Sequence, residues 1–299
     1  MTPGMTRHFP FMQVDAFTRR RLAGNPCAVV FDADGLDDAT MLAIAREMNL
    51  AETSFVLSPR QSDFRARYFT LDGEIPLAGH PTVATVHALV EFGQLAVEGG
   101  SKTISLEIGA GVIDVDVVIE DTTRVTMSQM KPRFLETVAP DVVLAMLGLD
   151  AADLTPDVPL QVVSTGTPQL MVPAVDLDVL RRARPDLEAL SRLKRETEAS
   201  CVHLFCRQGA TDEGDTFARD FDAPPEIIED PFTGSATGGM AAYLWHYGLI
   251  DDPEFIAQQG HWMDRPGNAF VEVVGPRDDI ETVRVGGYAV TTITGEFTI

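Results

Sequence analysis

The sequence has few cysteines, few lysines and no long apolar run. Only three of its 299 residues are cysteines, namely Cys27, Cys201 and Cys206, and no two of them form a CxxC pair. This argues against a disulfide framework and against a cysteine-based zinc site. No apolar stretch reaches the roughly 18 residues that a membrane helix needs. The first eleven residues also lack the apolar core of a signal peptide. We therefore expect a soluble, cytoplasmic protein.

Positive charge is also scarce. The chain has 23 lysines and arginines against 45 aspartates and glutamates, which gives a net charge of −22. An acidic surface repels phosphate backbones and anionic membranes, so we expect neither nucleic acid nor membrane as a partner. A local site can still be positive inside this field, so an anionic small molecule stays possible as a substrate.

Several motifs that hold cofactors are missing. The sequence contains no GxGxxG and no GxxxxGK[ST], so nothing indicates a nucleotide cofactor. None of the six histidines has HExxH spacing, and no carboxylate or cysteine completes a zinc pattern. We expect no metal and no cofactor.

Hydrophobic patterning predicts an α+β chain of many short strands and a few helices. The helices are expected at 37–48, 81–92, 140–147, 177–195 (interrupted at Pro185) and 236–247. Strands are expected over most of the rest, including 267–299, where Gly286 and Gly287 are predicted to form a turn.

Two stretches of the chain resemble each other. Arg67-Tyr68-Phe69 leads through Glu74-Ile75-Pro76 to Gly79-His80 and a predicted helix. In the same order, Arg219-Asp220-Phe221 leads through Glu229-Asp230-Pro231 to Gly234-Ser235 and another predicted helix. This weak repeat predicts a duplicated α+β unit, with a first half at 1–130, a second half at 131–279 and a boundary near 130–140.

The two helix starts are candidate anion sites. Gly79 and His80 begin one helix, and Gly234 and Ser235 begin the other. Free N–H groups and the helix dipole at such a point attract a carboxylate, and a duplication would turn both helix starts toward one cleft. The alternative is that His80 and Ser235 are only helix caps.

Two acidic residues are candidates for proton transfer. Glu52 stands between a predicted helix and an apolar strand, where burial would raise its pKa and suit it to act as a general base. Asp230 precedes the second helix and could orient a basic group or take part in the proton transfer. The alternatives are a solvated Glu at a strand end and an ordinary loop acid.

At these residues the chain resembles the PhzF-like family of phenazine-biosynthesis isomerases, within the diaminopimelate-epimerase-like fold. Four segments carry the resemblance: Val14-Asp15-Ala16-Phe17-Thr18 with Gly24-Asn25-Pro26-Cys27-Ala28-Val29-Val30; Glu47-Met48-Asn49-Leu50-Ala51-Glu52-Thr53-Ser54-Phe55-Val56; Arg67-Tyr68-Phe69-Thr70 with Gly73-Glu74-Ile75-Pro76-Leu77-Ala78-Gly79-His80-Pro81-Thr82; and Glu229-Asp230-Pro231-Phe232-Thr233-Gly234-Ser235-Ala236.

The resemblance implies two pseudo-symmetric halves, each an antiparallel sheet wrapped around a central helix. It also implies that the last strands, 280–299, return to the first half, and that the protein is a homodimer. The family's functional residues fall on matching positions: the catalytic Glu on Glu52, a cleft His on His80, an Asp on Asp230, a Ser on Ser235, and the helix-start glycines that meet a substrate carboxylate on Gly79 and Gly234.

The sequence departs from related patterns at three places. Epimerases of this fold carry cysteines just before the helix-start glycines, whereas this chain has Ala78 and Thr233, which argues against a two-thiol racemisation. Leu71-Asp72 replaces a frequent Pro-Thr and leaves the identity of the substrate open. Thr237-Gly238-Gly239 is smaller than the residues often found there.

These observations lead to one main hypothesis and two alternatives. We expect a cofactor-independent isomerase that moves a proton within a small carboxylate-bearing metabolite, with Glu52 as general acid and base and with His80 and Asp230 assisting. The first alternative is a metabolite- or protein-binding family member with little catalysis. The second, which Ala78 and Thr233 disfavour, is an amino-acid epimerase.

Overall fold

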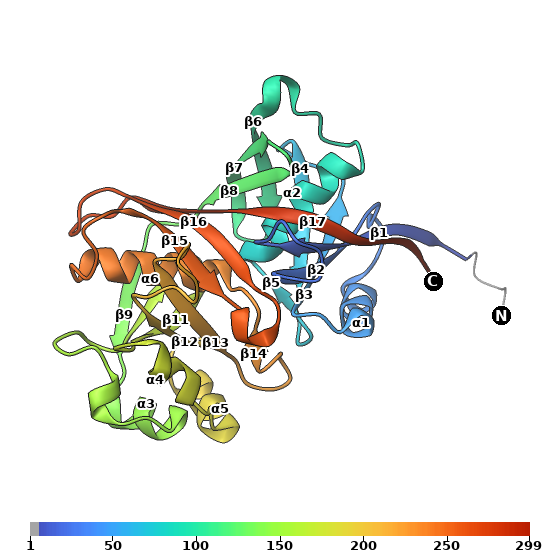
Figure 1. Cartoon of the computed structure of the whole chain (residues 1–299). Coiled ribbons are helices and arrows are strands. Elements are labelled where there is room, and N and C mark those ends of the chain that lie inside the picture. Colours follow the sequence, from blue (N-terminus) through green and yellow to red (C-terminus); the bar gives the residue numbers. More distant parts are fainter. Residues whose placement is uncertain (1–5) are drawn as a thin grey trace.

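The computed structural model describes residues 6–299, which form six α-helices and seventeen strands joined in one sheet (Figure 1). The first part of the chain holds ten of these elements: β1 (His8–Ala16), β2 (Asn25–Val30), α1 (Asp38–Met48), β3 (Glu52–Leu57), β4 (Phe64–Phe69), β5 (Glu74–Ile75), α2 (Gly79–Glu91), β6 (Ser101–Ile108), β7 (Gly111–Ile119) and β8 (Thr123–Ser128).

The rest of the chain holds the other thirteen: β9 (Arg133–Thr137), α3 (Pro140–Leu147), β10 (Gln161–Ser164), β11 (Pro168–Pro173), α4 (Leu177–Arg182), α5 (Leu187–Glu196), β12 (Val202–Cys206), β13 (Thr216–Phe221), β14 (Glu229–Asp230), α6 (Gly234–His246), β15 (Glu254–Gln259), β16 (Gly267–Val274) and β17 (Thr282–Thr298). The predicted helix break near Pro185 is confirmed, because α4 and α5 are separate helices.

Strand pairing follows the same order in both parts, and the expectation of purely antiparallel sheets is wrong because each part contains parallel pairs. β2 and β3 pair in parallel, β3 and β4 antiparallel, β4 and β5 antiparallel, and β4 and β6 in parallel. β11, β12, β13, β14 and β15 pair in the corresponding order and directions. An Arg–Glu pair ties the short strand in each case: Arg67 bonds both carboxylate oxygens of Glu74, and Arg219 bonds both of Glu229. These bidentate pairs hold the chain that leads into α2 and α6.

The helices α2 and α6 are the buried ones. Each has thirteen residues, and its first eleven residues are all buried. Neither helix carries a charged side chain in its first turn. Most of the side chains around each helix are small or apolar, which is typical of a helix that is buried on all sides. In Figure 1 strands lie on several sides of both helices.

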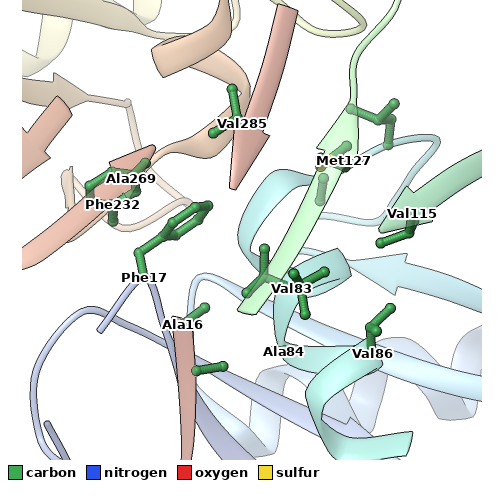
Figure 2. Packing of buried hydrophobic residues seen from close by; sticks show 14 of the residues in the cluster. Ala16, Phe17, Val83, Ala84, Val86, Val115, Met127, Phe232, Ala269 and Val285 are labelled. Carbon is green, nitrogen blue, oxygen red and sulfur yellow. The ribbon is translucent and has the colours of Figure 1, made fainter. Parts of the chain in front are cut away.

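One apolar core reaches from the first part of the chain into the second. It includes Val83 and Val86 of α2, Phe17 after β1, and Phe232 just before α6. Figure 2 shows Phe17 and Phe232 side by side, and their rings stack with centroids 4.3 Å apart. This packing joins the segment after β1 to the residue that leads into α6.

The prediction of a turn at Gly286 and Gly287 is wrong. Both glycines lie inside β17, which pairs with β1 and β8 of the first part as well as with β16. A Cβ at Gly286 would collide with the side chain of Thr126, and one at Gly287 would collide with the ring of Phe17. The glycines are therefore explained by close packing within the sheet and not by chain reversal.

Candidate active site

The starts of α2 and α6 touch each other. A Cβ added to Gly79 would lie 2.9 Å from the Cα of Gly234, so only glycine fits this approach. The residues that cap the two helices are Ala78 and Thr233, and neither cap makes a side-chain hydrogen bond to the helix. The alternative that His80 and Ser235 are helix caps is therefore wrong, and first-turn N–H groups of both helices stay free of a side-chain cap.

A cavity of about 330 Å³ opens at this contact. Its lining comes from Glu52 at the start of β3 and from the segments that lead into α2 and α6. All six residues singled out from the sequence line this cavity: Glu52, Gly79, His80, Asp230, Gly234 and Ser235.

The side chains of Glu52 and His80 lie next to each other in the wall of the cavity. Glu52 is the first residue of β3, which follows a left-handed turn at Asn49 after α1. Its Oε2 lies 3.2 Å from Nε2 of His80, and the side chains are 19% and 3% exposed. The geometry is not that of a hydrogen bond, and neither atom has a hydrogen-bond partner within residues 6–299.

Burial sets the protonation of this pair. Burial, followed by the charges of Asp230, Glu226 and nearby aspartates, raises the pKa of Glu52 well above its usual range. Burial lowers the pKa of His80 to about 3, so the imidazole is neutral at physiological pH. Glu52 is thus a largely buried acid beside a neutral imidazole.

Asp230 lies at the end of β14 and is partly buried by its neighbours. Its Oδ2 accepts a hydrogen bond of 2.6 Å from Thr233, and its Oδ1 accepts one of 2.8 Å from Asn25. Both hydrogen bonds lower the pKa of Asp230, but burial has the larger effect. Together with the charge of Asp220, burial raises the pKa of Asp230 to about 7. Asp230 therefore titrates near neutral pH, unlike an ordinary loop acid.

Two buried side chains that sequence reasoning did not assign to the site contact its residues. Asn25, at the start of β2, lies 3.0 Å from Nδ1 of His80 as well as bonding Asp230. Gln169, in β11, donates a hydrogen bond of 2.9 Å to the Ser235 hydroxyl oxygen. The available signal was the Asn25-Pro26 and Thr167-Pro168 pairs, which stand at the starts of β2 and β11 in the two parts of the chain.

Gln129 explains one of the small residues in α6. Its amide donates a hydrogen bond of 2.9 Å to the carbonyl of Gly234, and a Cβ at Gly238 would collide with this amide. Gly238 therefore leaves room for Gln129, which fixes the first turn of α6.

Much of the cavity lining is acidic. Asp72, Asp220, Asp222 and Glu226 line it, and Lys194 is the cation among the residues that line it. The Lys194 ammonium bonds Asp222 at 2.6 Å. The acid at Asp72, which distinguishes this sequence from the frequent Pro-Thr, thus faces the cavity.

The cysteines do not stand at the helix starts. All three are free and buried, and Cys201 lines the cavity with its sulfur 3.4 Å from Oδ1 of Asp220.

Within residues 6–299 there is no group of three His, Cys, Asp or Glu residues arranged to hold a metal ion. In the same part of the chain, no helix has the length and apolar character needed to cross a bilayer.

Comparison with known proteins finds relatives over nearly the whole chain. The family model described as "Phenazine biosynthesis-like protein" matches residues 14–295. An uncharacterized isomerase of Clostridium acetobutylicum is 32% identical, over 99% of this chain and 100% of its own length. The trans-2,3-dihydro-3-hydroxyanthranilate isomerase of Pseudomonas fluorescens is 31% identical, over 94% of this chain and 96% of its own.

A solved structure has a similar fold. The crystal structure of a PhzF-family phenazine biosynthesis protein from Bacillus anthracis superimposes with a TM-score of 0.86 at 32% identity, covering 98% of this chain and 99% of that one. Fold and relatives define the class of this protein, which is an isomerase of mixed helix and strand structure. More narrowly, the chain belongs to the phenazine biosynthesis-like, or PhzF, family.

Proposed function

We propose that this isomerase moves a proton within a small, conjugated carboxylate, with Glu52 as the group that removes the proton and returns it. The observation that carries the proposal is the position of Glu52. Its Oε2 is buried, has no hydrogen-bond partner among the described residues and lies in a cavity between two helix starts. A carboxylate with a raised pKa can act as base and then as acid at near-neutral pH.

The substrate carboxylate would bind at the start of α6. N–H groups in the first turn, near Gly234 and Ser235, supply hydrogen bonds and a local positive potential inside an otherwise acidic cavity. Because Gln169 donates to the Ser235 oxygen, the Ser235 hydroxyl hydrogen is available to a ligand. Gly79 contributes by allowing α2 to approach this point closely.

The proton balance is simple. Ionised Glu52 takes a proton from a carbon whose acidity comes from conjugation with the carboxylate, and the electron pair moves into the conjugated system. Protonated Glu52 then gives the proton to another carbon of the same molecule, which restores the carboxylate for the next turnover. His80 and Asp230 stabilise the charge that develops between these two steps.

Two further features belong to this proposal. Strands β2 to β6 pair with one another in the same order and directions as strands β11 to β15. This match supports a description of the fold as two pseudo-symmetric halves, 1–130 and 131–279, with 280–299 added to the first. Family resemblance supports a homodimer. Sedimentation of the purified protein tests the dimer.

The experiment for the function uses heavy water. The protein is incubated with trans-2,3-dihydro-3-hydroxyanthranilate and with other conjugated carboxylates, and proton NMR follows isomerisation and exchange at carbon. We expect turnover or exchange of at least one compound by the unmodified protein and its loss in Glu52→Gln. A shift in melting temperature without exchange or turnover would instead indicate a binding protein, and inversion of an amino acid would indicate an epimerase.

A further inference from the structure

Asn25 lies between two residues of the proposed site and touches both. Its side-chain nitrogen is 3.0 Å from Nδ1 of His80 and 2.8 Å from Oδ1 of Asp230. The same nitrogen is 2.8 Å from the backbone carbonyl oxygen of Phe232. Asn25 itself is fully buried, so no water competes for these contacts.

The Phe232 carbonyl fixes the orientation of the Asn25 amide. A carbonyl oxygen only accepts hydrogen bonds, so the group that faces it at 2.8 Å must be the NH2 and not the amide oxygen. The amide oxygen lies on the other side, buried and without a partner in the described part of the chain. Asn25 therefore presents only hydrogens to His80.

This orientation decides which ring nitrogen of His80 carries its proton. A hydrogen on Nδ1 would point at the NH2 of Asn25, which is also a donor, so Nδ1 must accept. A neutral imidazole has one N–H, which is then on Nε2, the atom that faces Glu52. We propose that Asn25 is a positioning residue, which holds His80 in the Nε2–H tautomer and so places the protonated ring nitrogen 3.2 Å from Oε2 of Glu52, inside the cavity.

The same contacts connect His80 to Asp230. The side-chain nitrogen of Asn25 has two hydrogens but three acceptors within hydrogen-bond distance, namely Nδ1 of His80, Oδ1 of Asp230 and the Phe232 carbonyl oxygen. At least one hydrogen is therefore shared between two of these acceptors. His80 then cannot reorient without disturbing the bond to Asp230. The kinetic consequence of this arrangement rests on the function proposed above, whereas the tautomer does not.

The tautomer is measured by NMR on uniformly ¹⁵N-labelled full-length protein. The signals of His80 are assigned by their loss in His80→Gln. We expect a protonated Nε2 and an unprotonated Nδ1 in the unmodified protein at neutral pH. Observation of a protonated Nδ1 there would overturn the proposal, and this test needs no variant of Asn25 that folds.

Two substitutions and one control test the role of Asn25. In Asn25→Ala the donor is gone, so we expect a mixture of tautomers; in the near-isosteric Asn25→Asp we expect the proton to move to Nδ1. Gln259→Leu is the matched control, because Gln259 is a buried amide that bonds Asp230 and Thr233 but not His80. An unchanged Nε2–H tautomer in folded Asn25→Ala and Asn25→Asp would contradict the proposal, as would a shifted tautomer in Gln259→Leu.

Kinetics separate positioning from binding. With whichever conjugated carboxylate the unmodified protein turns over, we expect Asn25→Ala to lower kcat about tenfold or more, with a much smaller change in KM. A rise in KM alone would contradict a positioning role. If no compound is turned over, the proposed function fails while the NMR result still decides the tautomer.

Discussion

The Nε2 atom of His80 and the Oε2 atom of Glu52 lie 3.2 Å apart, and neither has a hydrogen-bond partner among residues 6–299. Two buried polar atoms left open in this way cost stability, since each has lost its water. The arrangement is explained if a ligand completes it, which is the physical basis for placing the chemistry at this pair.

Glu52→Gln should stabilise the protein at alkaline pH. The pKa of Glu52 is raised on folding, so the folded protein holds this proton more tightly than the unfolded chain does. Stability is then lost as the pH rises from the unfolded pKa of about 4.3 toward the folded pKa. Urea unfolding should show Glu52→Gln to be more stable by about 1 kcal/mol or more at pH 8. At pH 4 the two proteins should differ little. An equal difference at both pH values would contradict this assignment of the burial cost.

Asp230→Asn should move the acidic limb of the activity profile to lower pH. The negative charge of Asp230 is the second cause, after burial, of the raised pKa of Glu52. Its removal makes Glu52 easier to ionise, so the base form persists at lower pH. The measurement is kcat/KM against pH for both proteins. A limb that stays in place, or one that moves to higher pH, would show that Asp230 and Glu52 do not interact in this way.

Gly79→Ala should destabilise the protein. The added Cβ would lie 2.9 Å from the Cα of Gly234, which is backbone and cannot move aside easily. Overpacking of this kind costs about 1–3 kcal/mol, which exceeds the gain of at most about 1 kcal/mol in helix propensity. Gly73→Ala is the control, because a Cβ there meets no atom within 4 Å. Comparable chemical-denaturation midpoints for Gly79→Ala and the unmodified protein would refute the contact between the helix starts.

The thiols should react slowly in the native protein. Burial raises the pKa of the Cys206 thiol to about 11 and raises those of Cys27 and Cys201 well above the usual range. Because the thiolate is the reactive form, we expect little labelling by a disulfide reagent at pH 8, and three labelled groups after denaturation. Rapid labelling of Cys201, which lines the cavity, would show that its environment is less apolar and less acidic than described.

The sequence predicted those parts of the fold that local patterns determine. The helix 37–48 could be placed because Asp37 or Asp38 can cap it and apolar residues recur on one face. The structure has α1 at Asp38–Met48 with Asp37 as the cap. Gly286 and Gly287 were misread because a glycine pair is typical of turns. The reason for glycine there is the approach of Phe17 and Thr126, which are distant in sequence.

The sequence indicated residues that line the candidate site, but not the buried residues that hold those side chains in position. Gly79 and Gly234 stand at helix starts, and Glu52 stands at a strand start, so short motifs point to them. Asn25 and Gln169 act through contacts across the fold, to His80 and to Ser235. No local pattern determines such contacts, because they depend on how β2 and β11 pack against α2 and α6.

The most direct test of the account is the rate of isomerisation by Glu52→Gln compared with that of the unmodified protein. The reaction is followed by proton NMR in heavy water with a conjugated carboxylate that the unmodified protein turns over. Because general acid–base catalysis typically contributes about 10²–10⁴-fold, the account predicts a loss of kcat of that size in a variant with an unchanged circular dichroism spectrum. A folded Glu52→Gln protein that retains full turnover would contradict the central role of Glu52.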